Sequence, residues 1–140
     1  MIPANERGSV TLFVLGLCVL VLFVGGLALD LWRAFSERLA LASAADAAAV
    51  AGAGALDAEH FRRTGQARLD PALAEQRALG AMAGQADRRS LTGAVARASA
   101  EEVTVTATGR VEFTLLGIFL AGEDPFTVTV SSTADARRGA

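Results

Sequence analysis

The most apolar part of the chain lies close to its N-terminus. Residues 8–29 form a run of 22 residues without a charged side chain. A helix of about 20 such residues spans about 30 Å, which is the hydrocarbon thickness of a bilayer. A buried helix in a small soluble protein would keep a polar face, and this run has none. The pattern predicts a membrane-spanning helix over residues 9–29, after a short N-terminal segment of residues 1–8.

The helical pattern continues beyond the apolar run. Residues 30–56 contain no proline and are rich in alanine, leucine, arginine and glutamate, which favour helix. We therefore expect one helix from about residue 9 to residue 56, in which residues 30–56 are an alanine-rich continuation past the membrane. Asp30 lies where this helix leaves the lipid, and we expect its side chain to be hydrated.

Small side chains dominate this continuation between residues 40 and 55. They let helix backbones approach closely, and Ala48 and Gly52 form a small-xxx-small pair. Two interpretations stay open: the stretch packs against helices of other subunits, or the chain's own domain covers it. For the first interpretation, the candidate interaction residues are Ala44, Ala45, Asp46, Ala48 and Gly52.

A second helix is predicted after a polar break at residues 57–66. Asp70 is a candidate N-cap residue, and Pro71 suits the first helical position. One modest apolar stripe follows at helical spacing, formed by Leu79, Met82, Ala83 and Ala86. We expect this helix to end near Ser90 or Gly93.

Strand periodicity follows this second helix. Residues 103–114 alternate strictly between polar side chains and apolar residues or glycine, the period of a half-buried strand. Either one long strand bends at Gly109, or Thr108 and Gly109 turn a hairpin. Residues 126–131 alternate in the same way. The fold class is therefore predicted as α+β: a long N-terminal helix, a second helix and a small antiparallel ribbon or sheet, with residues 57–140 as a small domain outside the membrane.

An apolar connector, residues 115–124, joins the two alternating segments. Its large side chains form a docking patch if they are exposed, and they form core if they fold under the strands. We favour core, because so small a domain needs the buried area. The candidate docking residues under the other interpretation are Leu115, Leu116, Ile118, Phe119 and Leu120.

Composition argues against several kinds of chemistry. The net charge is −2, the isoelectric point is about 5.4 and no basic cluster exceeds two residues, so we expect no nucleic-acid partner. One cysteine, Cys18, allows no internal disulfide and no cysteine-based zinc site. The one histidine, His60, has no neighbouring nucleophile, and a solvated loop histidine describes it better than a catalytic one. We expect no enzyme, no metal, no cofactor and no small-molecule substrate.

The N-terminal layout is similar to that of a known family. Arg7 and Gly8 precede an apolar helix that ends at Asp30, and residues 39–56 read LALASAADAAAVAGAGAL. This resembles the TadE/TadG-like group of Tad (tight adherence, Flp) pilus-assembly proteins, whose pattern here reads approximately Leu-Gln-x-Ala-Ala-Asp-Ala-Ala-Ala-Leu-Ala-Gly-Ala. The resemblance covers about residues 7–56, with Ala42 in place of the Gln and Val50 in place of the Leu.

The resemblance implies a membrane-anchored, minor pilin-like or pseudopilin-like component of a Tad-type (Flp, type IVb) pilus or secretion system. Such a protein crosses the cytoplasmic (inner) membrane once, with its N-terminus inside and its C-terminal domain outside the cytoplasm, and some members reach the pilus or cell surface. The partners implied are membrane lipid and other pilin-like or Tad assembly subunits, which it contacts by helix packing, in homo- or hetero-oligomers.

Two processing sites are candidates near the N-terminus. Family members cut by prepilin peptidase carry Glu at the fifth position after the cleavage glycine. A cut between Gly8 and Ser9 places Phe13 at that position, so the chain is more similar to the non-cleaved, TadG-type branch. The alternative to an anchor is signal-peptide cleavage after Ala28, which would release a secreted soluble binding module.

Overall fold

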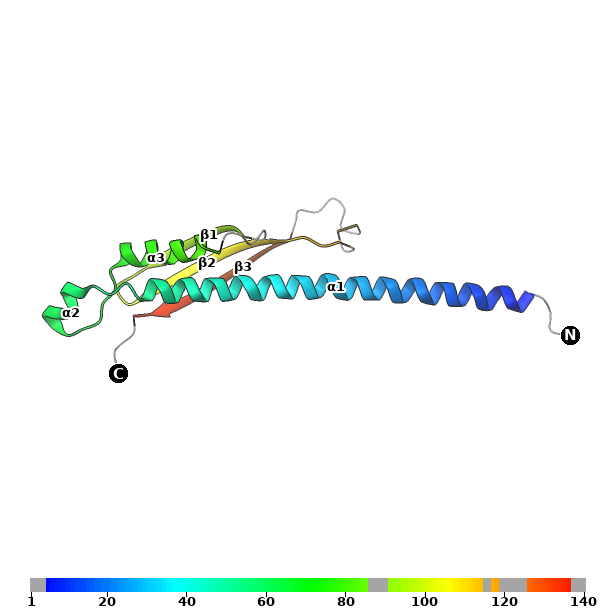
Figure 1. Ribbon diagram of the computed structural model, residues 1–140, viewed down its shortest axis with the longest axis horizontal. Helices are drawn as coiled ribbons and strands as arrows, with labels where there is room; N and C mark the ends of the chain where they lie inside the picture. Colours follow the sequence, from blue (N-terminus) through cyan, green and yellow to red (C-terminus); the bar gives the residue numbers. More distant parts are fainter. Residues whose placement is uncertain (1–4, 86–90, 115–116, 119–125, 137–140) are drawn as a thin grey trace. The chain divides into compact units, whose positions relative to one another are not determined.

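The computed structural model describes residues 5–85, 91–114, 117–118 and 126–136 (Figure 1). Their elements are the helices α1 (Asn5–Ala53), α2 (Ala58–Thr64) and α3 (Pro71–Ala83) and the strands β1 (Leu91–Ala98), β2 (Glu102–Val111) and β3 (Phe126–Asp135). The chain forms two compact units: Met1–Phe35 with Phe113–Glu123, and Ser36–Glu112 with Asp124–Ala140. The predicted α+β class is confirmed.

Helix α1 bears out the predicted long helix, since it runs from Asn5 to Ala53. It ends in a turn in which the Ala55 backbone N–H donates to the Gly52 carbonyl at 2.9 Å. Every described residue of its apolar run up to Gly25 is exposed. The apolar part of α1 is long enough to cross a membrane.

Helix α3 begins as predicted but ends earlier. The Asp70 carboxylate caps it by accepting from the Leu73 backbone N–H at 3.2 Å, and Pro71 is its first residue. It ends at Ala83 rather than near Ser90 or Gly93. Its buried face consists of Ala74, Ala78 and Met82.

The predicted apolar stripe of α3 was therefore placed partly on the wrong face. Met82 is buried, but Leu79 is 41% exposed and Ala83 is exposed, while Ala86 lies outside the described residues. The reason is the close approach of α1. A Cβ placed on Gly52 would lie 3.2 Å from the Ala78 Cβ, and no leucine fits at such a contact.

A short helix, α2, forms inside the predicted polar break. The Asp57 carboxylate accepts from the backbone N–H groups of Glu59 at 3.1 Å and His60 at 2.9 Å. These two bonds satisfy donors that a helix start otherwise leaves unpaired. The helix stops at Gly65, whose φ of 70° is a left-handed conformation that glycine adopts readily.

The three strands form an antiparallel sheet in the order β1-β2-β3. β2 continues straight through Gly109, which pairs with Val128, so the one-strand alternative is correct and the hairpin alternative is wrong. In the middle of the sheet, Val105 pairs with Ala96 on one side and Ser132 on the other. β3 extends past the predicted residue 131 to Asp135.

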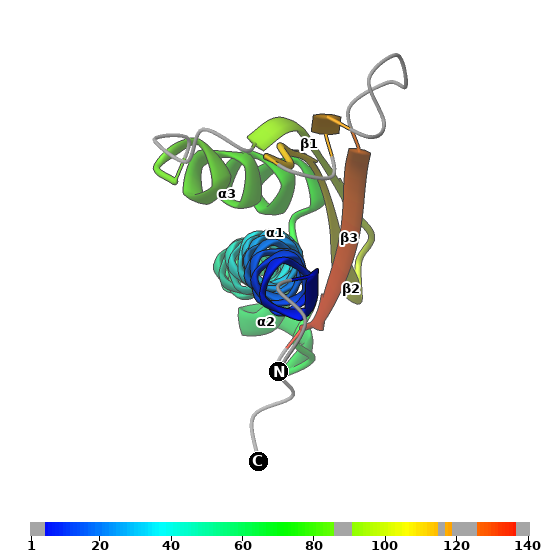
Figure 2. The same cartoon turned by 90° about the vertical axis from the view of Figure 1, so that its right-hand side faces the viewer.

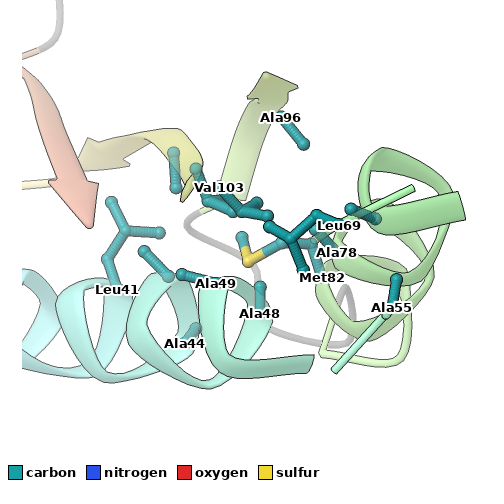
Figure 3. Packing of buried hydrophobic residues seen from close by; sticks show 14 residues of the cluster. Leu41, Ala44, Ala48, Ala49, Ala55, Leu69, Ala78, Met82, Ala96 and Val103 are labelled. Atoms are coloured by element: carbon teal, nitrogen blue, oxygen red, sulfur yellow. The ribbon is translucent and has the colours of Figure 1, made fainter. Parts of the chain in front are cut away.

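The core lies between the sheet, α3 and the C-terminal part of α1 (Figures 2 and 3). Figure 2 shows α3 and the sheet on two sides of this helix. The sheet contributes the buried face of β2, in which Val103 and Val105 are fully buried. The cluster is built mostly from alanines; its α1 members are Leu41, Ala44, Ala45, Ala48 and Ala49. Small side chains therefore set how closely the layers approach.

Candidate functional site

Four of the five candidate interaction residues on α1 lie in the chain's own core. Ala45 and Ala48 have no exposed surface, Ala44 has almost none and Gly52 is buried. A Cβ on Gly52 would stand 3.0 Å from the Ala74 carbonyl oxygen and 3.0 Å from the Val103 Cγ1 atom. Figure 3 shows this side of α1 facing Val103 and Met82. Coverage by the chain's own domain therefore describes these four residues in this fold, and their packing against another subunit stays a prediction.

The fifth residue, Asp46, is exposed and makes a polar contact within the same unit. Its carboxylate accepts a hydrogen bond from the hydroxyl of Ser132 on β3. Because β3 pairs with β2 on one side only, this bond ties an edge strand to α1. The sequence suggested a partner contact for Asp46, but the bond to Ser132 joins residues 86 positions apart, which no local pattern reveals.

The face of α1 opposite the core is open. Leu39 and Val50 are 73% and 64% exposed, and Ser43 and Ala47 between them are also exposed. These four residues recur every three or four positions, so they share one side of the helix. We call this set the outer face of α1. It carries two large apolar side chains, Leu39 and Val50, at exposed positions.

A second polar tie lies at the end of the apolar run. Asp30 is only 2% exposed, so the expectation of a hydrated boundary acid was wrong. Its Oδ1 accepts from the Thr114 backbone N–H at 3.1 Å, and Arg33 Nη1 donates to the Thr114 Oγ1 at 3.2 Å. The Asp30–Thr114 bond spans 84 positions in sequence. The buried carboxylate is thus paired, as a carboxylate away from water must be.

The apolar connector is exposed at the two positions that the structure describes, Gly117 and Ile118. Ile118 is 68% exposed, so it does not form the core that we favoured for the connector. Leu115, Leu116, Phe119 and Leu120 lie outside the described residues. The docking interpretation of the connector therefore has one described side chain in its favour.

The candidate processing residues lie in α1. Gly8 and Ser9 are exposed, and a Cβ on Gly8 would meet no atom within 4 Å. Phe13, which stands where a processed pilin carries Glu, is also exposed. Cleavage at this point stays untested.

His60 lies in α2, next to the residues that cap that helix. The residue is half-buried in α2, and its backbone N–H, rather than its ring, donates to Asp57. That hydrogen bond lowers the pKa of the Asp57 carboxyl, and a weaker bond from the Glu59 N–H adds to it against partial desolvation. Within the described part of the chain, no three His, Cys, Asp or Glu side chains are grouped to hold a metal ion.

The comparisons with known proteins agree with the N-terminal layout. Residues 8–55 match the model of a family described as Flp pilus-assembly, TadE/G-like. The match confirms the resemblance at the N-terminal region, and it covers nearly all of α1. No curated protein and no solved structure matches the chain.

Proposed function

We propose that this chain, whose N-terminal region matches TadE/G-like Flp pilus-assembly proteins, is a membrane-anchored, minor pilin-like component of a Tad-type pilus or secretion system. It acts by binding other subunits and not by catalysis. The observation that carries the proposal is the family match over residues 8–55, which coincides with a helix long and apolar enough to span a membrane.

Exposure along α1 supports the membrane anchor. The run up to Gly25 presents leucine, valine and phenylalanine to every side, with side chains such as Phe13 and Leu22 more than two thirds exposed. So much contiguous apolar surface is unfavourable in water and favourable in lipid. We propose a single pass through the cytoplasmic membrane, with the N-terminus inside and the sheet-containing unit outside.

The surface for helix packing is the outer face of α1. The small residues of the opposite side are used by the chain's own core, so they hold the helix against its domain. Leu39 and Val50 remain free to contact an apolar helix of a neighbouring pilin-like subunit. Ser43 and Ala47 between them are small enough to let such a helix approach closely.

The anchor is tested first by the intact mass of the protein extracted from its native membrane. Retention of the full chain, near 14.4 kDa, supports an uncut anchor. Loss of residues 1–8 would show prepilin-type processing. Loss of residues 1–28, with the remainder in the soluble fraction, would replace the proposal by a secreted binding module.

The packing surface is tested by photo-crosslinking in cells that assemble the pilus. A photoreactive amino acid at Val50 should crosslink to another pilin-like or assembly subunit. The matched control carries it at Gln76, an exposed residue of α3. Equal crosslinking at both positions, or none at Val50, would contradict the outer face as the packing surface.

A further inference from the structure

The sheet has two edge strands, β1 and β3, because β2 lies between them. On one side of β2, the Ala136 backbone N–H donates to the Glu101 carbonyl at 2.6 Å. On the other side, the Ser99 N–H donates to the Glu102 carbonyl at 2.8 Å. In an antiparallel pair, opposite residues exchange such bonds at every second position. The even-numbered residues of β3 and the odd-numbered residues of β1 therefore bond to β2, and the backbone groups of the others point away from the sheet.

The outer edge of β3 is regular and uncharged. Its outward backbone groups include those of Thr129, Ser131 and Thr133, which have no hydrogen-bond partner among the described residues. Residues 128–134 carry no charge and no proline. The register of β3 on β2 continues without a bulge along the whole strand. Edge strands of this kind accept a further strand, because protein sheets otherwise protect their edges with charges, prolines or bulges.

β1 presents the second edge of the sheet and runs in the same direction as β3. Both strands are antiparallel to β2, so they are parallel to each other. At one end of β1, the outward N–H of Ala98 donates to the Glu75 carboxylate of α3 at 3.0 Å. Within the described part of the chain, the outward groups of Ala94 and Ala96 have no such partner. The edge of β1 is thus closed by α3 at Ala98 and open at the two alanines before it.

The two edges fit each other in one direction only. Odd-numbered side chains of both strands, such as Ser131 and Val95, are exposed, whereas even-numbered ones, such as Val130 and Ala96, face the core. In a parallel pair, a residue bonds to the two neighbours of the residue opposite it. An odd-numbered residue of β3 then bonds to even-numbered residues of β1, and exposed side chains stay beside exposed ones. An antiparallel pair of the same two edges would place exposed residues beside core residues.

Charge selects the register between the two edges. Asp135 is exposed near the end of β3 and stands opposite Glu102 of β2, an arrangement in which the two acids repel each other. Arg97 is exposed near the end of β1. When Arg97 of a second copy stands opposite Asp135, a cation lies beside this acidic pair, which is favourable. The same register places Val95 of the second copy opposite Thr133.

We propose that copies of this chain standing side by side in the membrane join their sheets, with β3 of one copy pairing in parallel with β1 of the next. This interaction goes beyond the proposed function and rests on its membrane anchor only for the shared orientation of the copies. Anchors in one membrane give the copies the same direction, which suits two edges that run in parallel. Because the two edges differ, the contact is heterologous and repeats from copy to copy.

The test is disulfide crosslinking of the full chain in its native membrane, in a Cys18→Ser background. Val95→Cys combined with Thr133→Cys places two thiols opposite each other between neighbouring copies, whereas β2 separates the two positions within one chain. Opposite residues of paired strands have Cβ atoms about 5 Å apart, close enough for a disulfide after a small adjustment. The matched control combines Thr133→Cys with Gln76→Cys, at an exposed position of α3.

The proposal expects dimers, trimers and longer oligomers from the pair at positions 95 and 133, severalfold more abundant than from the control pair. Equal crosslinking by both pairs, or none by either, would overturn it. Ser131→Cys alone tests the competing arrangement, in which two β3 strands pair antiparallel around Ser131. Dimers of this single variant as abundant as the oligomers of the double variant would also overturn the proposal.

The charge pair is tested by reversal in the crosslinking variant. Arg97→Glu places a third acid beside Asp135 and Glu102 and should reduce the oligomers severalfold. Adding Asp135→Arg restores an opposite-charge pair and should recover them. Both positions are exposed, so neither change disturbs the core. Unchanged oligomers in Arg97→Glu, or no recovery in the double reversal, would overturn the proposed register.

Carbonate extraction of the same membranes separates this proposal from the membrane anchor. If the chain stays in the membrane pellet and forms no oligomers, the sheet pairing fails and the anchor stands. If the chain is released into the soluble fraction and still forms the oligomers, the anchor fails and the sheet pairing stands. Release without oligomers would overturn both.

Discussion

The two parts of α1 are both rich in apolar residues, but they differ in the size of those side chains. The N-terminal part carries large residues such as Leu15 and Phe13, which are exposed on every side. The C-terminal part buries one side only, and after Leu41 that side is built from alanine and glycine. Fluid lipid can accommodate bulky side chains, whereas the sheet and α3 are fixed in place, so only small side chains fit between them and α1. Side-chain volume, more than hydrophobicity, therefore tells which part of the helix meets lipid and which part meets protein.

The largest effect should come from bulk at the tightest contact. Gly52→Leu places its side chain where a Cβ alone would lie 3.0 Å from the Ala74 carbonyl oxygen, so we expect the unit to lose more than about 3 kcal/mol of stability. The matched control is Gly16→Leu, where a Cβ would meet no atom within 4 Å. Thermal unfolding of the full chain in micelles measures both, and a Gly52→Leu protein as stable as the control would contradict the volume argument.

The next largest effect concerns the face of α3. Met82→Ala removes a fully buried side chain and should lower the free energy of unfolding by about 2–5 kcal/mol. Leu79→Ala, three positions earlier, removes a side chain that is 41% exposed and should cost less than half as much. Denaturant titration of both variants decides which residues of α3 face the core, and equal losses would contradict the assigned face.

A smaller effect is expected at the tie between α1 and β3. Ser132→Ala removes the hydroxyl that binds Asp46, and a hydrogen bond of this kind contributes about 0.5–1.5 kcal/mol, or more when one partner is charged. Thr129→Ala, on the opposite face of the same strand, is the control. Hydrogen exchange of the β3 amides should accelerate only in Ser132→Ala. Equal acceleration in both would show that the Asp46 contact does not hold the strand.

The smallest effect is the pH dependence of α2. The pKa of the Asp57 carboxyl is below its ordinary value because the His60 backbone N–H donates to it. The unfolded chain therefore binds the proton more tightly, and the N-cap supports α2 above about pH 4 and loses that support as the pH falls further. The protection factor of the Phe61 amide, which corrects for the intrinsic pH dependence of exchange, should fall more steeply than in Asp57→Asn as the pH is lowered through about pH 4. Parallel pH profiles would contradict the role of the carboxylate.

The sequence predicts the elements whose patterns are local. The proline-free apolar and alanine-rich run predicts α1, the Asp70–Pro71 pair predicts the start of α3, and strict alternation predicts β2. β1 was missed because LTGAVARA contains little β-branched or aromatic sequence. It exists because β2 offers an unpaired edge and its alanines pack on the core.

The candidate site also has a part that the sequence predicts and a part that it does not. The family pattern singled out residues 39–56 at the end of α1, but composition alone does not tell whether their small residues face a partner or the chain's own sheet. Asp30 was expected in water because its nearest neighbours in sequence suggest nothing else. Its partner, Thr114, lies three residues after the end of β2, and only the folded chain brings the two together.

The 84 positions between Asp30 and Thr114 also mean that Thr114 is synthesised well after Asp30. A ribosome adding about 5–20 residues per second needs about 4–17 seconds to make that stretch. During this interval the newly made helix has neither the Asp30–Thr114 bond nor the sheet that covers its alanines. A helix face made of alanine exposes less apolar surface to proteases and chaperones than one made of leucine. The small residues that let the layers pack closely therefore also limit the apolar surface of the nascent chain.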